Sequence, residues 1–77
     1  MTPKDIENDL IRLHGYVIGN EELSALLGFR TMSAFRQAIS RKKIPVKIFN
    51  IENRRGKFAF ASDVAEWLFE QRSKAMN

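Results

Sequence analysis

Basic and hydrogen-bonding side chains gather in one short stretch of the chain, AFRQAISRKKIP at residues 34–45. Arg36 and Gln37 lie inside the stretch, and three consecutive cations at residues 41–43 follow them before Pro45. Gln pairs bidentately with adenine and Arg with guanine, while Ser, Arg and Lys all bind phosphate oxygens. The stretch therefore has the donors and the charge to bind a polyanion.

A second basic stretch, ENRRGK at residues 52–57, supplies Arg54, Arg55 and Lys57, and Arg30 is a third basic site. A single basic helix end is commonly solvated surface, because cations at that end also complement the helix dipole. Three basic elements brought together by a fold are harder to explain in that way. Their combination favours a binding role.

The charge of the chain is unevenly distributed. Residues 30–57 hold nine basic side chains and one acidic side chain, Glu52, which gives that segment a formal net charge of +8. The remaining residues hold four basic and eight acidic side chains, a net charge of −4. Such segregation produces a field with one positive pole, which attracts an anionic partner.

Two short helices are expected to position the basic residues. Residues 21–27 predict the first helix, in which Leu23, Leu26 and Leu27 face the core and Gly28 ends the helix. Glu21 and Glu22 lie in its first turn, where negative charge is favourable.

The second helix is predicted over residues 32–42, with Thr31 or Ser33 as its N-cap and Pro45 preventing its continuation. At 100° per residue, one side of this helix gathers the apolar residues Met32, Phe35, Ala38 and Ile39. The opposite side presents Ser33, Gln37, Ser40 and Arg41, with Arg36 at its flank. Two helices joined by a short turn form a helix-turn-helix, which here covers about residues 20–43. The second helix of this motif enters the major groove of DNA.

A β-hairpin is expected after Pro45, because VKIFNI and KFAF are rich in β-branched and aromatic residues and flank the polar turn ENRRG. Such a hairpin, about residues 45–61, would form a wing whose Arg and Lys side chains lie along phosphates or in a minor groove. The aromatic side chains could instead stack on single-stranded bases. We expect Phe35, Phe58, Phe60 and Trp67 in the core, because a domain this small needs them there.

Helices are also expected at both ends of the chain. Thr2, Pro3 and Asp5 form a capping signature for a helix over residues 2–14, in which Ile6, Leu10 and Leu13 recur at helical spacing. YVIGN then reads either as a brief strand or as an apolar lead into the next helix, with Asn20 as its N-cap. The last helix is predicted over residues 62–73, burying Val64, Trp67 and Leu68 and fraying from about Ser73.

Length and composition exclude several classes of function. Seventy-seven residues make a single small domain without room for a large catalytic cleft. The absence of cysteine excludes disulfides and thiolate metal sites, and His14 is the only histidine, so we expect no metal and no cofactor. The sequence contains no nucleotide-binding loop, nucleophile elbow or zinc-protease motif, and we expect no enzymatic activity. No signal peptide or membrane span is evident, which predicts a cytoplasmic protein.

The order of these motifs resembles the MerR-like winged helix domains of phage and plasmid excisionases and AlpA-type regulators. The resemblance covers about residues 16–70. It rests on Glu22-Leu23, Leu26-Leu27-Gly28, Phe35-Arg36, Lys43-Ile44-Pro45, the stretch NRRGKFAF, Asp63-Val64 and Trp67-Leu68. It implies a small architectural or regulatory protein that binds near recombination sites or acts on transcription of mobile-element genes, without catalytic residues. Two departures are Lys42, where relatives often have glycine, and the additional N-terminal helix, which either covers the core or uses Ile11 in a dimer.

The sequence therefore predicts an α+β, mainly helical fold: a winged helix-turn-helix with a two-stranded hairpin wing and an extra N-terminal helix. Its expected function is sequence-specific binding of double-stranded DNA. The alternative is a protein-interaction module that uses the same basic face on an acidic protein, as an anti-repressor or an integrase partner. With either function, the protein is expected to be a monomer or a weak homodimer. The expected contact residues are Arg30, Thr31, Ser33, Arg36, Gln37, Ser40, Arg41, Lys42, Lys43, Arg54, Arg55 and Lys57.

Overall fold

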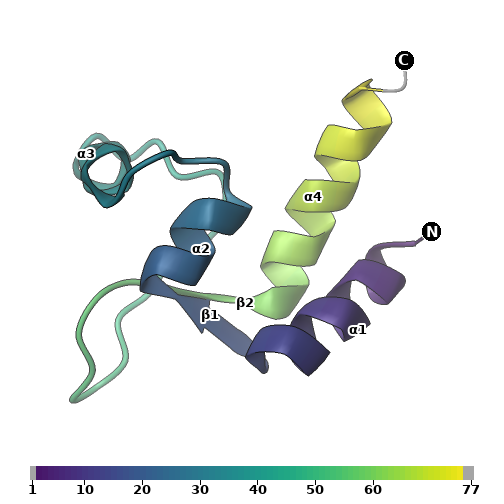
Figure 1. The fold of residues 1–77 in the computed structure, drawn as a ribbon, viewed down its shortest axis with the longest axis horizontal. Helices are drawn as coiled ribbons and strands as arrows, with labels where there is room; N and C mark the ends of the chain where they lie inside the picture. Colours follow the sequence, from purple (N-terminus) through teal and green to yellow (C-terminus); the bar gives the residue numbers. More distant parts are fainter. Residues whose placement is uncertain (1, 76–77) are drawn as a thin grey trace.

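The computed structural model describes residues 2–75, which form four helices and one two-stranded antiparallel sheet (Figure 1). The elements follow in the order α1 (Pro3–His14), β1 (Val17–Gly19), α2 (Asn20–Leu26), α3 (Met32–Ser40), β2 (Phe58–Phe60) and α4 (Ala61–Ala75). The expectation of a mainly helical α+β fold is confirmed. Among the described residues, no helix combines the length and the apolar character needed to cross a membrane.

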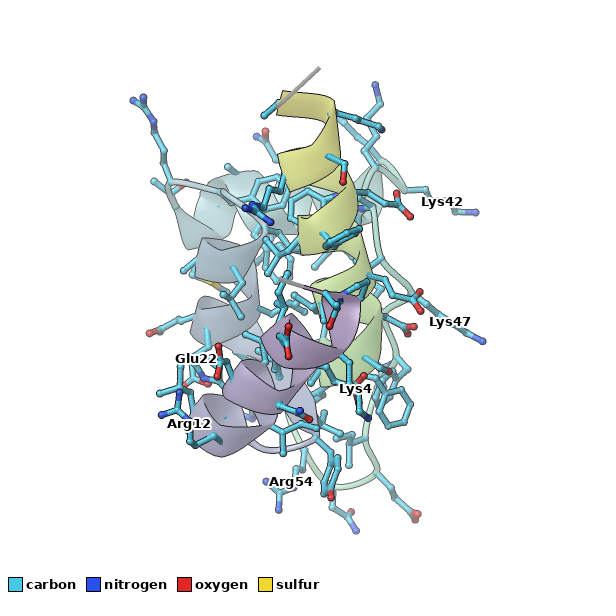
Figure 2. All side chains as sticks on the ribbon, turned by 90° about the vertical axis from the view of Figure 1, so that its right-hand side faces the viewer. Lys4, Arg12, Glu22, Lys42, Lys47 and Arg54 are labelled. Atoms are coloured by element: carbon cyan, nitrogen blue, oxygen red, sulfur yellow. The ribbon has the colours of Figure 1, made fainter. Side chains whose placement is uncertain are left out.

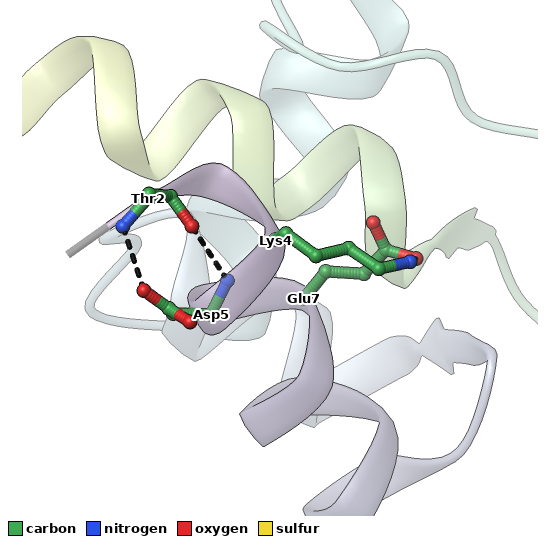
Figure 3. Close-up of polar contacts among 4 residues, drawn as sticks. All are labelled: Thr2, Lys4, Asp5 and Glu7. Atoms are coloured by element: carbon green, nitrogen blue, oxygen red, sulfur yellow. Dashed lines mark hydrogen bonds and ion pairs between the residues drawn. The ribbon is translucent and has the colours of Figure 1, made fainter.

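The start of α1 carries the predicted capping box (Figure 3). Thr2 Oγ1 accepts a hydrogen bond from the Asp5 N–H at 3.2 Å, and the Asp5 carboxylate accepts one from the Thr2 N–H at 2.9 Å. The latter bond, which favours the charged carboxylate, lowers the pKa of Asp5. Lys4 and Glu7 add an ion pair of 3.5 Å on the same turn. Both reciprocal bonds satisfy N–H groups that the first helical turn leaves unpaired.

α1 lies alongside α4 and covers one side of the core (Figure 1). Leu10 is buried, and Ile6 and Ile11 pack against the core. The helix therefore covers the core, and Ile11 is used there. The prediction for Leu13 was wrong: its side chain is 65% exposed, because the apolar stripe of α1 runs through Ile11 instead.

The sheet is not the predicted hairpin. β2 pairs with β1, in the register Val17↔Phe60, Ile18↔Ala59 and Gly19↔Phe58, so YVIGN does contain a strand. On its other edge, β2 meets only Phe49, through two hydrogen bonds of 2.9 Å between Phe49 and Phe58. Residues 46–48 form no strand, although Val46 and Ile48 pack against the core. The loop that follows is thus closed by one bridge.

The aromatic residues of β2 lie on the outer face of the sheet. Ile18 and Ala59 are fully buried on the inner face, and because side chains alternate along a strand, Phe58 and Phe60 point the other way. Phe60 is 49% exposed and stacks against Phe49, with ring centroids 5.1 Å apart. The prediction that Phe58 and Phe60 belong to the core was wrong.

The core takes residues from all four helices and both strands, and α4 contributes only through its first turns. Phe35 is fully buried, and its ring lies 5.6 Å from that of Phe29, centroid to centroid. Trp67 and Leu68 pack at the edge of the core as partly buried residues. The buried apolar residues are Leu10, Ile18, Leu23, Leu27, Phe35, Ala59, Ala61, Val64 and Ala65.

α4 is longer than predicted. It begins at Ala61, directly after β2, and continues through Ala75, whereas fraying was expected from about Ser73. At its N-terminal end the Ala61 N–H donates to the Tyr16 carbonyl at 2.8 Å, which joins α4 to the sheet.

Candidate nucleic-acid interface

α2 and α3 are joined by a short turn that contains Gly28, whose φ of 89° is a conformation that favours glycine. Of the two predicted N-caps of α3, Thr31 is the one that the structure shows. Its Oγ1 accepts a hydrogen bond from the Ala34 N–H at 3.0 Å. The predicted cap of α2 was wrong. Asn20 is the first residue of that helix and Gly19 occupies the N-cap position without a side-chain bond.

α3 turns its apolar side inward as the spacing predicts. Phe35 is buried, and Met32 and Ile39 are partly buried against the core. The polar residues expected on the opposite side are all exposed: Ser33, Arg36, Gln37, Ser40 and Arg41. Arg30 and Thr31, in the turn before the helix, are exposed as well.

α3 ends two residues before the predicted boundary, in a C-terminal turn built around Lys42. The Lys43 N–H donates to the Ala38 carbonyl at 2.8 Å and the Lys42 N–H to the Ile39 carbonyl at 3.1 Å, the two bonds of a Schellman motif. Lys42 adopts a φ of 58°, the left-handed conformation that usually belongs to glycine at this position. The turn leaves the side chains of Lys42 and Lys43 exposed beyond the helix.

The second basic stretch forms a loop, residues 50–57, between the Phe49–Phe58 bridge and β2. Asn53 and Gly56 take positive φ values of 65° and 94° within it, which turn the chain back. Arg54 and Arg55 are exposed. Lys57 is partly buried at the base of the loop, where its Nζ donates to Asn50 Oδ1 at 2.8 Å.

Asn20 attaches the 50–57 loop to the start of α2. Its backbone N–H donates to the Lys57 carbonyl at 3.1 Å, and its side-chain Nδ2 donates to the Arg55 carbonyl at 3.3 Å. Gly56 lies directly against the Asn20 side chain, so that a Cβ at position 56 would overlap it. Sequence reasoning assigned Asn20 to capping and missed this role. The signal for it was the Gly-Asn pair, since Asn tolerates the left-handed φ of 54° that Asn20 adopts.

α3 and the 50–57 loop lie on the same side of the molecule, away from α1 and α4 (Figure 1). Lys42, which follows α3, and Arg54, in the loop, lie at opposite ends of that arrangement, and Lys47 projects from the connecting segment (Figure 2). The acidic residues outside the loop belong to α1, α2 and α4: Asp5, Glu7, Asp9, Glu21, Glu22, Asp63, Glu66 and Glu70. The charge segregation of the sequence is therefore also a segregation between elements of the fold.

The structure brings Arg36 and Lys57 together around one cavity between α3 and the loop. The remaining expected contact residues do not form a single cluster. Arg30 and Thr31 precede α3, Lys42 and Lys43 follow it, and Arg54 and Arg55 lie in the loop. Two residues outside the expected set also belong to this region: Asn50, which binds Lys57, and Lys47, which is exposed.

The chain matches no protein-family model, no curated protein and no solved structure.

Proposed function

We propose that the chain binds double-stranded DNA in a sequence-specific manner, as a winged helix-turn-helix protein of the MerR-like type. The observation that carries the proposal is that α3 and the 50–57 loop, two exposed basic elements, lie on the same side of the molecule, opposite α1 and α4. A helix that presents Arg and Gln beside a basic loop is the combination by which such proteins contact base edges and phosphates together.

In this proposal the outward side chains of α3 read bases in the major groove. Gln37 and Arg36 are exposed near the middle of the helix, and Ser33 is exposed in its first turn. Gln suits adenine, Arg suits guanine, and Ser accepts or donates to either base or to phosphate. Arg41 extends the same side of the helix toward the flanking backbone.

The 50–57 loop supplies contacts that do not depend on sequence. Arg54 and Arg55 are exposed in the loop, and they have the length to follow phosphates or enter a narrow minor groove. Lys57 donates a hydrogen bond to the neutral side chain of Asn50. The anchoring of the loop by Asn20 supports this assignment, because a loop held at a fixed place relative to α3 loses less conformational freedom on binding.

The biological role that follows is that of a small architectural or regulatory factor, which acts on recombination or transcription through DNA and, in some settings, beside an integrase. The proposal assigns no catalytic residue, metal or cofactor.

Fluorescence anisotropy across a salt series tests the proposal, with a labelled mixed-sequence DNA duplex as the probe and single-stranded DNA and duplex RNA as controls. Because phosphate contacts release counterions, the duplex affinity is expected to fall with a log–log slope of several units. The controls are expected to bind more weakly at every salt concentration. An absence of duplex binding at physiological salt contradicts the proposal, and the basic elements would then serve an acidic protein partner.

A further inference from the structure

A cavity of about 300 Å³ separates α3 from the 50–57 loop. Its floor is the apolar side of α3, formed by Met32, Phe35 and Ile39, and its rim is polar. Met32 and Ile39 are only partly buried, so the floor offers apolar surface that the protein itself does not cover. The volume lies at the lower end of the range of small-molecule pockets, roughly 300–1,000 Å³.

Two cations stand at the rim of this cavity. Arg36 is exposed and takes part in neither of the ion pairs that residues 2–75 form, Lys4–Glu7 and Arg12–Asp9, nor in the His14–Glu22 contact. Lys57 donates one hydrogen bond, to Asn50, and its ammonium group has two further hydrogens to donate. Asn20, which also lines the cavity, adds a polar group beside them. An apolar floor beneath unpaired positive charge is complementary to an amphipathic anion.

We propose that this cavity binds a small organic carboxylate with an aromatic or branched aliphatic body. The body lies on Met32, Phe35 and Ile39, and the carboxylate meets Arg36 and Lys57 at the rim. Guanidinium groups bind carboxylates through two parallel hydrogen bonds, so Arg36 fixes the direction in which the ligand enters. A ligand of this class would connect α3 to the 50–57 loop across a gap that side chains leave open.

The ligand would also control DNA binding, an inference that rests on the proposed function. Arg36 cannot hold a carboxylate and a guanine edge or phosphate at the same time. Bound ligand therefore lowers the affinity for duplex DNA, and by linkage bound duplex lowers the affinity for the ligand by the same factor.

Backbone amide NMR shifts of the full chain test the site directly, with 3-phenylpropanoate as the probe. Two matched compounds serve as controls: 3-phenylpropan-1-ol has the body without the charge, and acetate has the charge without the body. We expect 3-phenylpropanoate to give saturable shifts in α3 and in the 50–57 loop at millimolar concentrations, with an affinity about tenfold above either control. The variant Arg36→Gln is expected to weaken this binding about tenfold, while Arg72→Gln, at an exposed arginine of α4, leaves it unchanged.

Three outcomes overturn the site: no saturable shift, equal binding of the alcohol, or unchanged affinity in Arg36→Gln. If the same amides respond to duplex and not to the carboxylate, the cavity belongs to the DNA contact and the proposal is wrong. Ligand binding is measured without DNA, so a protein that fails to bind duplex can still show the site. The antagonism is tested by adding 3-phenylpropanoate to the duplex complex, and it fails if saturating ligand leaves the duplex affinity unchanged.

Discussion

The side-chain amide of Asn20 donates a hydrogen bond to the backbone carbonyl of Arg55, 3.3 Å away and 35 residues along the chain. With the bond from the Asn20 N–H to the Lys57 carbonyl, it holds the 50–57 loop to the first residue of α2. Gly56 lies between these two acceptors and against the same side chain. One asparagine side chain therefore adds to the backbone contacts that hold the basic loop beside the helices.

Substitution of Asn20 separates the contribution of its side-chain hydrogen bond from that of its tolerance of a left-handed backbone conformation. Asn20→Ala removes the side-chain bond and places Ala at a φ of 54°, so we expect the free energy of unfolding to fall by about 1–2 kcal/mol. Asn20→Gly removes the same bond but tolerates the left-handed conformation, and its loss should be smaller. Urea unfolding of both variants measures the difference. Equal stability of the alanine and glycine variants would show that the backbone conformation at position 20 carries no cost.

A second prediction concerns the packing of the sheet. Gly19 has a φ of −140°, which any residue adopts, but a methyl group there would overlap the Phe58 ring of the paired strand. Gly19→Ala is therefore expected to destabilise the fold by about 1–3 kcal/mol through overpacking alone. The double variant Gly19→Ala with Phe58→Leu should recover part of the loss. If the two substitutions simply add in thermal unfolding, the ring and the glycine are not in contact.

A third prediction concerns the end of α3. Lys42 holds the position at which Schellman motifs usually have glycine, and its φ of 58° costs about 1–2 kcal/mol for a residue with a Cβ. Part of this is offset because glycine is more flexible in the unfolded chain, so Lys42→Gly should raise the free energy of unfolding by about 0.5–1 kcal/mol. Lys43→Gly is the matched control, since it removes the same charge at a residue without a positive φ, and it should not stabilise. Denaturant midpoints that rank the two variants in the opposite order would contradict this reading of the turn.

The two proposed kinds of DNA contact predict different mutant behaviour. Gln37→Ala should reduce the preference of the protein for its best site, with a loss of about 1–3 kcal/mol there and little loss on other sequences. Arg55→Ala should weaken binding to all sequences alike and reduce the salt slope by roughly one unit. Anisotropy on a selected site and on an unrelated duplex measures both. If neither substitution changes affinity, α3 and the loop have been assigned the wrong roles.

Local signals were sufficient to predict the helices. The Thr2–Asp5 capping box, the Thr31 cap and the apolar spacing of α3 all involve residues within one or two helical turns, and the structure contains each of them. The length of α4 was underestimated. The sequence carries no stop signal near Ser73, and the helix continues through Ala75.

Strand pairing could not be predicted in this way, because it depends on competition between distant segments. The β-branched and aromatic residues of VKIFNI and KFAF suggested a hairpin, but β2 offers each edge to one partner, and Val17–Gly19 forms the longer pairing. That choice also decides which aromatic residues are buried. Ala59 faces the core in this register, which leaves Phe60 on the outer face beside Phe49.

The candidate interface was predicted only in part for the same reason. Exposure of Arg36, Gln37 and Arg41 follows from helical periodicity, which is local. The role of Asn20 arises from a contact with Arg55, 35 residues along the chain, and the cavity arises where α3 meets a later loop, so no local spacing rule predicts either of them.

The most direct test of the central claim is to map backbone amide shifts while duplex DNA is added to the labelled protein. The account predicts that shifts concentrate in the turn before α3, in α3 and in the 50–57 loop, while α1 and the C-terminal half of α4 remain unchanged. Shifts centred on α1 or α4, or no shifts in the presence of duplex, would contradict it.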